Sequence, residues 1–140
     1  MSLWMHPNEA TLAGMALGSV RAVYVDRRTA RSALEWSDAG PEVVFADAPE
    51  QRVDVTIVRE ADGAGLGFAP ALAPGATGLL SFVASPNGSD ANRVRVEANV
   101  VVLSVEHALR LERASQQTVR CVAVSADGAQ DPVTETEVNP

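Results

Sequence analysis

The sequence predicts an all-β fold, a single antiparallel β-sandwich or barrel domain with at most one or two short helices. Valine-rich stretches recur along the chain and are separated by clusters of Gly, Pro, Asn and Asp, which is typical of strands joined by turns. In the clearest stretches apolar and polar residues alternate, as in strands that bury one face and expose the other. The length of 140 residues suits one domain.

The N-terminal segment, residues 1–17, is expected to precede the domain as an arm or a short helix. Asn8 is a suitable N-cap for a helix over residues 8–17, and an ordered arm is the alternative. The domain itself is predicted to span residues 18–129. Residues 130–140, which carry acidic side chains and two prolines, are expected to form a flexible tail.

The first part of the domain is predicted to contain three short strands. Residues 18–27 run into a charged corner at residues 26–28, and residues 31–36 follow it, so that the two stretches together resemble a hairpin. The Gly40-Pro41 pair predicts a turn, after which residues 42–46 are expected to form the third strand. Another break is expected directly afterwards, where Pro interrupts the chain.

Two later strands show the strongest alternation, and both are expected to bury one face. In the strand at residues 51–60, which follows the break at residues 48–50, the apolar positions are Val53, Val55 and Ile57. In the strand at residues 93–102, the apolar positions are Val94, Val96, Ala98, Val100 and Val102. Strands at residues 78–84 and 117–126 complete the predicted set.

Two stretches leave more than one interpretation open. Residues 105–114 place apolar side chains near helical spacing among charges, so either a short helix or a strand is compatible with them. The loop at residues 62–77 is rich in Gly, Ala and Pro and carries no charge after Asp62. We expect the apolar side chains of this loop to contact another subunit, and packing onto their own domain is the alternative. These side chains are Leu66, Phe68 and Leu72.

Charge and cysteine content argue against several classes of protein. The chain has 11 Arg, no Lys and 18 Asp or Glu, and its formal net charge of −7 is unsuited to a protein that grips nucleic acid by neutralising phosphates. Cys121 is the single cysteine, so an internal disulfide is excluded, and its β-rich surroundings predict a buried position. No apolar run approaches the roughly 18 residues of a membrane helix, and the N-terminus lacks the basic region of a secretory signal. We therefore expect no membrane association.

Motifs for catalysis and cofactor binding are weak. Residues 63–67, GAGLG, lack the context of a dinucleotide-binding loop, because Pro70 and Pro74 oppose the helix that must follow it. Ser104 and His107 are the nearest Ser/His pair, but no nucleophile-elbow motif accompanies them. We expect no enzyme activity, no metal and no cofactor.

The C-terminal part of the chain resembles the closing hairpin of phage and prophage tail proteins. Residues 99–133 contain an apolar strand, a polar connection and a second strand that runs into the sequence SADGAQDPV. Residues 75–82, GATGLLSF, are similar to the strand that leads into such a hairpin. Within the motif, Asp127 and Gly128 are expected to form a structural turn. The resemblance covers less than half of the chain, and the N-terminal half contains no motif of the family.

The resemblance implies a tail-tube-like subunit, which is a structural protein of a virion or prophage without catalytic residues. Such a subunit self-assembles into hexameric rings that stack into a tube through which DNA travels. The implied partners are other copies of the chain and other tail components, without sequence-specific nucleic-acid contacts. The implied location is the virion, or the bacterial cytoplasm before assembly. The net charge of −7 agrees with a channel wall that does not hold DNA, and another small tail component is compatible with the same residues.

A monomeric β-sandwich module that binds a glycan or a protein partner is the alternative. A glycan-binding face needs exposed aromatic side chains, and the chain offers Trp4, Tyr24 and Trp36 for that purpose. A position in the core is an equal alternative for Tyr24 and Trp36. The two interpretations differ in the oligomeric state that they predict.

Overall fold

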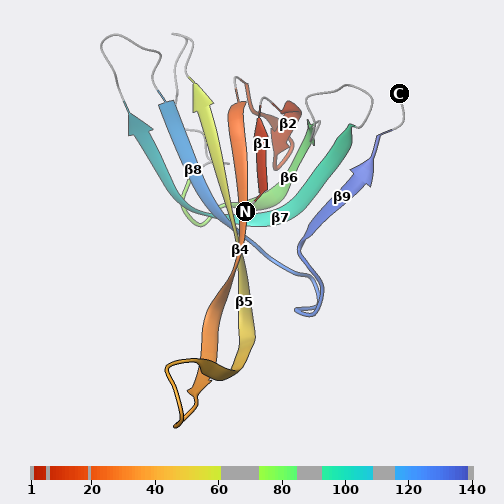
Figure 1. Cartoon of the computed structure of the whole chain (residues 1–140). Coiled ribbons are helices and arrows are strands. Elements are labelled where there is room, and N and C mark those ends of the chain that lie inside the picture. Colours follow the sequence, from red (N-terminus) through yellow and green to blue (C-terminus); the bar gives the residue numbers. More distant parts are fainter. Residues whose placement is uncertain are drawn as a thin grey trace.

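A computed structural model shows one antiparallel β-sheet, and the residues that it describes contain no helix (Figure 1). The described residues are 2–5, 7–18, 20–60, 73–84, 93–108 and 116–138. The strands are β1 (Ser2–Met5), β2 (Asn8–Leu12), β3 (Met15–Ala16), β4 (Val20–Trp36), β5 (Val43–Glu60), β6 (Thr77–Ala84), β7 (Val94–Ala108), β8 (Gln116–Ala123) and β9 (Val133–Glu137). The predicted all-β fold class is confirmed.

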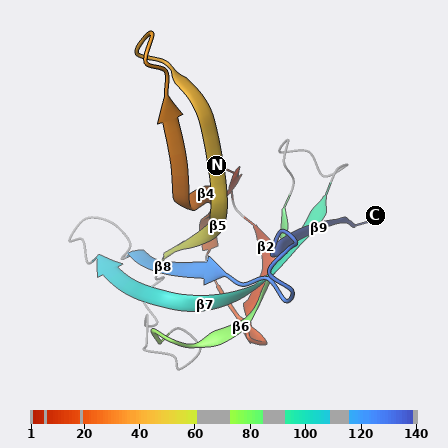
Figure 2. The same cartoon turned by 90° about the horizontal axis from the view of Figure 1, so that it is seen from below.

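The sheet is curled but not closed. Its strands follow the order β1-β4-β5-β8-β7-β6-β2-β3, and β9 pairs with β7 beside β8. Although β1 and β2 lie near opposite ends of this order, Met5 and Asn8 are three residues apart and can be separated by no more than about 11 Å. The two ends of the sheet must therefore approach each other, and Figure 2 shows the resulting curvature in β6, β7 and β8.

The concave side of the sheet holds a single hydrophobic core. The alternation predicted for β5 is confirmed, because Val53, Val55 and Ile57 are buried while the residues between them are half-buried on the outer face. Cys121 on β8 is buried, as its surroundings predict. Side chains from β2, β4, β5, β6, β7, β8 and β9 all belong to one cluster of buried residues, so the described strands form one packing unit.

The hairpin predicted at residues 18–36 is wrong, because residues 20–36 form the single long strand β4. The charged corner at residues 26–28 continues the strand, with Arg27 opposite Val53 and Arg28 opposite Arg52. Charged side chains on an exposed strand need no turn, because both faces of the strand can meet water.

The break predicted at residues 48–50 is also wrong, because β5 runs from Val43 to Glu60. Pro49 is accommodated at a shift in register: Arg31 pairs with Glu50 and Ala33 with Asp47, so two residues of β5 oppose one residue of β4. A bulge is one of the few places in a strand where the missing N–H of Pro is tolerated. The turn predicted at Gly40-Pro41 is confirmed and joins β4 to β5.

The short helix considered for residues 8–17 is wrong, because β2 and β3 form a tight hairpin there. Ala13 and Gly14 make its two-residue turn, with φ values of 53° and 81°. Positive φ at both central residues is the signature of a type I′ turn, whose twist matches that of the flanking strands. The ordered-arm alternative is nearer to the structure, in which this segment is paired into the sheet.

Two C-terminal expectations are corrected as well. The helix considered for residues 105–114 is wrong over residues 105–108, which continue β7 and pair with β8; the remainder lies outside the described residues. The flexible tail expected at residues 130–140 is wrong over Val133–Glu137, which form β9 against β7. Val133 is buried in the core, which secures β9 to the body.

Candidate functional site

The most conspicuous surface feature is a two-stranded ribbon that projects from the body. Residues 29–50, here called the ribbon, comprise the end of β4, the turn and the start of β5 (Figure 1). Every ribbon residue is exposed except the half-buried Ser37. Five large apolar side chains are nevertheless found on it: Leu34, Trp36, Val43, Val44 and Phe45. Trp36 is 58% exposed and Val44 is 65% exposed, so these groups are not covered by the rest of the described chain.

The pairing of the ribbon gathers apolar groups on one face. Leu34 and Trp36 are two residues apart on β4 and therefore share a face, and Val43 lies with them because it is the partner of Trp36. Glu35 and Phe45 are paired and lie on the opposite face. The ribbon thus presents one mainly apolar face and one face that mixes a carboxylate with an aromatic ring.

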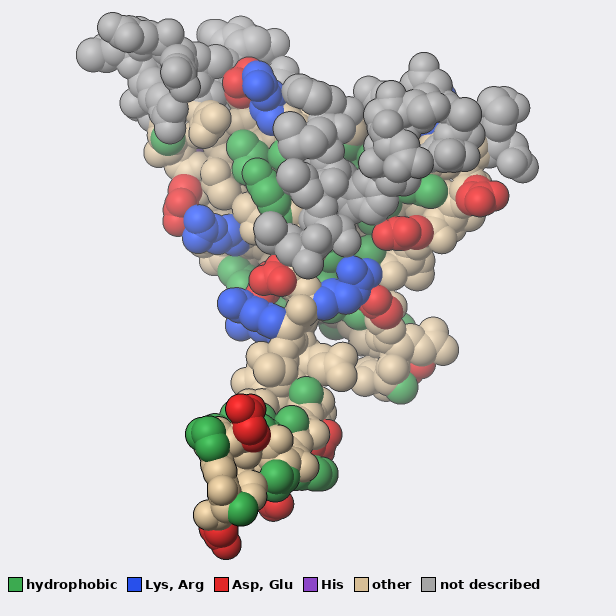
Figure 3. Space-filling view, viewed as in Figure 1, with side chains coloured by type: hydrophobic (Ala, Val, Ile, Leu, Met, Phe, Trp, Pro, Cys, Tyr) green, Lys and Arg blue, Asp and Glu red, His purple; other side chains and the backbone are tan. Residues whose placement is uncertain are grey.

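The ribbon is also strongly acidic. Residues 29–50 contain one arginine and five carboxylates, so four of the seven net negative charges of the chain lie there. The acidic residues are Glu35, Asp38, Glu42, Asp47 and Glu50. Figure 3 shows green apolar and red acidic groups together at this end of the molecule. A partner surface would need apolar contacts together with positive charge.

An ion pair anchors the base of the ribbon to the loop that follows β8. Nε of Arg27 donates a hydrogen bond to Oδ2 of Asp131 at 2.7 Å. Partial burial opposes ionisation of Asp131, but the hydrogen bond from the Val133 amide and the charge of Arg27 outweigh it, so the pKa of Asp131 is lowered. A groove of about 710 Å³ lies between the ribbon base and this loop.

The structure places Asp127 and Gly128 in a bend of the same loop. Oδ1 of Asp127 accepts hydrogen bonds from the amides of Ala129 at 2.9 Å and Gln130 at 3.1 Å. These bonds, and that with Ser125 Oγ, stabilise the charged form and lower the pKa of Asp127. Gly128 has a φ of 75°, a left-handed conformation that favours glycine.

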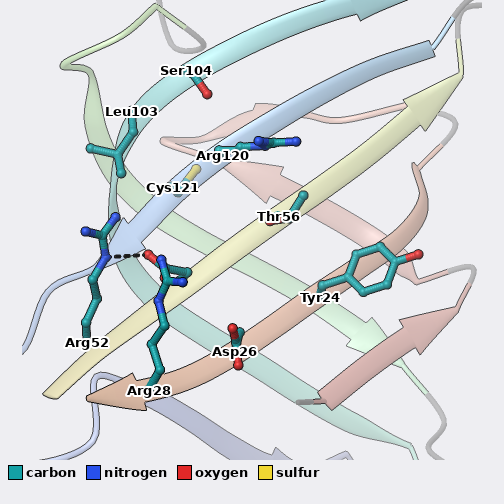
Figure 4. Close-up of a pocket in the computed structure, with 10 residues that line it drawn as sticks. Tyr24, Asp26, Arg28, Arg52, Thr56, Leu103, Ser104, Arg120 and Cys121 are labelled. Atoms are coloured by element: carbon teal, nitrogen blue, oxygen red, sulfur yellow. Dashed lines mark hydrogen bonds and ion pairs between the residues drawn. The ribbon is translucent and has the colours of Figure 1, made fainter. Parts of the chain in front are cut away.

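A second feature of the outer face is a shallow cleft of about 400 Å³, here called the arginine cleft. It is defined by Arg28 on β4, Arg52 and Asp54 on β5, Leu103 on β7 and Arg120 on β8. The carboxylate of Asp54 forms ion pairs with Nε of Arg52 at 2.6 Å and with a terminal nitrogen of Arg28 at 2.7 Å. Figure 4 shows the side chains of Arg28 and Arg52 lying close to each other. Leu103, at the extra position of a bulge in β7, follows the buried Val102 on the outer face of the strand and is 46% exposed.

The residues considered for catalysis are not brought together. Ser104 and His107 are three residues apart on β7, which places their side chains on opposite faces of the strand. Burial raises the pKa of the Cys121 thiol to about 12, so Cys121 is unsuited to act as a nucleophile. Within the described ranges, no group of three His, Cys, Asp or Glu side chains could hold a metal ion.

The loop residues predicted to contact a subunit, Leu66, Phe68 and Leu72, lie outside the described residues, as does the glycine-rich segment at residues 63–67. Sequence reasoning missed the ribbon as a surface. The sequence pattern that could have indicated it is the run Val43-Val44-Phe45, which lies across the Gly-Pro turn from Trp36. Three consecutive apolar residues depart from the alternation that is expected of a half-buried strand.

Comparison with known proteins supplies no family. No protein-family model matches the chain, and neither does any curated protein. In the part of the chain that the structure describes, there is no helix long and apolar enough to span a bilayer.

Proposed function

We propose that the chain is a structural subunit that works by self-assembly, most concretely a tail-tube-like subunit of a phage or prophage that forms hexameric rings. The observation that carries this proposal is the projecting ribbon with five exposed large apolar side chains. Other copies of the chain and other tail components would be its partners. Its location would be the virion, or the bacterial cytoplasm before assembly.

The ribbon favours assembly for an energetic reason. A two-stranded ribbon without a core of its own is marginally stable in water, and this one exposes apolar side chains on both faces. Contiguous exposed apolar groups mark interaction surfaces in soluble proteins. Burial of Trp36 and Phe45 against another copy would remove both from water, at about 25 cal/mol for each Å² of apolar surface covered.

The charge of the chain supports the same proposal. A net charge of −7 disfavours tight contact with DNA phosphates, as a channel that lets DNA pass requires. The resemblance of residues 99–133 to tail proteins lies in the part of the sheet formed by β7, β8 and β9.

The test compares the wild-type chain with the double variant Trp36→Ser/Phe45→Ser. Sedimentation velocity and negative-stain imaging over a wide concentration range should show rings or stacked rings for the wild type and monomers for the variant. Leu79→Ser, which changes an exposed leucine on β6 instead, is the matched control and should assemble normally. A wild-type chain that stays monomeric at every concentration would exclude self-assembly.

A monomeric binding module is the second candidate, and the exposure of Trp36 favours it. An indole ring that is 58% exposed is available for stacking on a sugar ring or for contact with a foreign protein. This candidate predicts a wild-type monomer that binds an immobilised glycan panel and loses binding in Trp36→Ser. Assembly of the wild type without glycan binding would count against it.

A further inference from the structure

We infer that the ribbon of one copy docks into the arginine cleft of a second copy, so that subunits join head to tail. This inference rests on the proposed self-assembly and goes beyond it by naming the two surfaces that meet. One surface is the ribbon, residues 29–50, and the other is the cleft of Arg28, Arg52, Leu103 and Arg120.

The two surfaces match in charge. The ribbon carries five carboxylates and one arginine, whereas the cleft presents Arg28 and Arg52 around the carboxylate of Asp54. Asp26 also lines the cleft, and its third arginine, Arg120, forms a long ion pair with Glu106 at 3.7 Å. A guanidinium has five N–H donors, so Arg28 and Arg52 retain donors after their contacts with Asp54. These arginines are 58% and 41% exposed at the side chain and can bind further carboxylates.

The two surfaces also match in apolar character. Leu103 is exposed at the cleft because it follows the buried Val102 and therefore lies on the outer face of β7. Trp36, on the mainly apolar face of the ribbon, would cover it, and the planar guanidinium of Arg120, whose side chain is 54% exposed, can stack on the indole ring. A surface with arginines and a single exposed leucine suits an acidic ribbon with aromatic side chains better than it suits free anions.

A ribbon cannot reach the cleft of its own chain. The cleft begins at Arg28, and the ribbon continues β4 away from it toward the turn that contains Asp38. Eight residues of strand lead from Arg28 to Trp36 at the end of β4, which corresponds to about 26 Å at 3.3 Å per residue. Figure 1 shows the ribbon leaving the body without folding back. The occupant of the cleft must therefore come from a second copy.

Contact between two different surfaces of the same chain is heterologous. A pair of copies then retains one free ribbon and one free cleft, so addition of copies continues until a ring closes or a filament grows. A contact between two ribbons would instead be isologous and would stop at a dimer. The two arrangements can be separated by mixing variants.

The experiment uses two variants of the full chain, each lacking one surface. The ribbon variant is Trp36→Ser/Phe45→Ser, and the cleft variant is Leu103→Ser/Arg120→Gln, which leaves both arginine contacts of Asp54 intact. The matched control is Leu79→Ser/Arg21→Gln, which makes the same chemical changes outside both surfaces. Thermal unfolding verifies that each variant folds, and Arg28→Gln replaces the cleft variant if it does not.

Each surface variant alone should assemble at least about tenfold more weakly than the wild type and the control. Mixed in equal amounts, the two variants should form a 1:1 dimer and nothing larger, because only one intact ribbon and one intact cleft can meet. A cleft variant that assembles like the wild type, or a mixture that stays monomeric, would overturn the docking inference while leaving self-assembly in place. A monomeric wild type would overturn both.

Discussion

At the scale of single residues, Gly78 on β6 lies against the β2–β3 turn with no room for a side chain. A Cβ atom on Gly78 would lie 2.5 Å from Cβ of Ala13 and 2.9 Å from its Cα. We predict that Gly78→Ala lowers the free energy of unfolding by about 1 to 3 kcal/mol, because the turn or β6 would have to move. Urea unfolding followed by circular dichroism measures the change.

Gly18→Ala provides the control for this substitution. A Cβ at Gly18 meets no atom within 4 Å, so this variant should unfold at nearly the same urea concentration as the wild type. Equal free energies of unfolding for Gly78→Ala and Gly18→Ala would show that the β2–β3 turn moves to accommodate the added Cβ without loss of stability.

Cys121 offers a reporter of core integrity. Its pKa of about 12 keeps the thiol protonated at pH 8, and its side chain is buried. We predict that iodoacetamide labels the native protein at least about a hundredfold more slowly than the urea-unfolded protein, in which the thiol recovers a pKa near 8.5. Mass spectrometry of timed samples measures both rates, and comparable rates would contradict the buried position.

The lowered pKa values of Asp127 and Asp131 predict an acid-sensitive loop. A carboxylate whose pKa is lower in the folded state contributes stability that is fully present above its ordinary value of 3.8 and is lost as the pH falls through the folded value. Stability should therefore decline below about pH 4. The variant Asp127→Asn/Asp131→Asn should show a smaller decline, measured by urea unfolding at a series of pH values. An unchanged decline would assign the acid sensitivity to other carboxylates.

At the scale of elements, the ribbon is separable from the body. The buried core cluster contains no residue from 30–50, and Thr29 pairs with Gln51 at the base of the ribbon. We predict that replacing residues 30–50 by Asn-Gly, a sequence suited to a two-residue hairpin turn, leaves a folded body. Its free energy of unfolding should change by no more than about 1 kcal/mol. Thermal unfolding and sedimentation test this, and loss of the folded state would show that the ribbon supports the core.

The sequence predicted most of the body because alternation and burial coincide there. Val53, Val55 and Ile57 on β5 alternate in the sequence and lie in the core. The same reasoning failed where a strand has no core to face: the charged corner at residues 26–28 and Pro49 suggested breaks, yet β4 and β5 support each other across them. Local patterns identify half-buried strands, whereas a ribbon exposed on both faces is defined by its pairing.

The candidate site could be predicted only in part. The turn at Asp127 and Gly128 could be predicted because both residues are typical of turns and are adjacent in the sequence. In the structure, Asp127 supplies a side-chain acceptor and Gly128 adopts a left-handed conformation. No sequence pattern indicates the arginine cleft, because Arg28, Arg52 and Arg120 come from three strands and meet only after β5 pairs with both β4 and β8.

At the scale of the whole molecule, charge is divided unevenly between the ribbon and the outer face of the body. Attraction between these regions on different copies weakens when salt shortens the Debye length from about 10 Å at 0.1 M to about 3 Å at 1 M. We predict that assembly is weaker at 1 M sodium chloride than at 0.1 M, measured by sedimentation velocity. Stronger assembly at high salt would indicate that apolar contacts alone hold the copies together.

The N-terminal segment has a consequence for the order in which the chain can fold. β1 pairs with β4, and β2 pairs with β6, whose residues are synthesised almost half a chain later. During translation, β2 therefore cannot pair until β6 has been synthesised. β4 and β5 are joined by a short turn and can pair earlier. The ribbon is among the first parts able to form, and the segment that draws the ends of the sheet together is among the last. A newly made chain would thus present its ribbon before its body is complete.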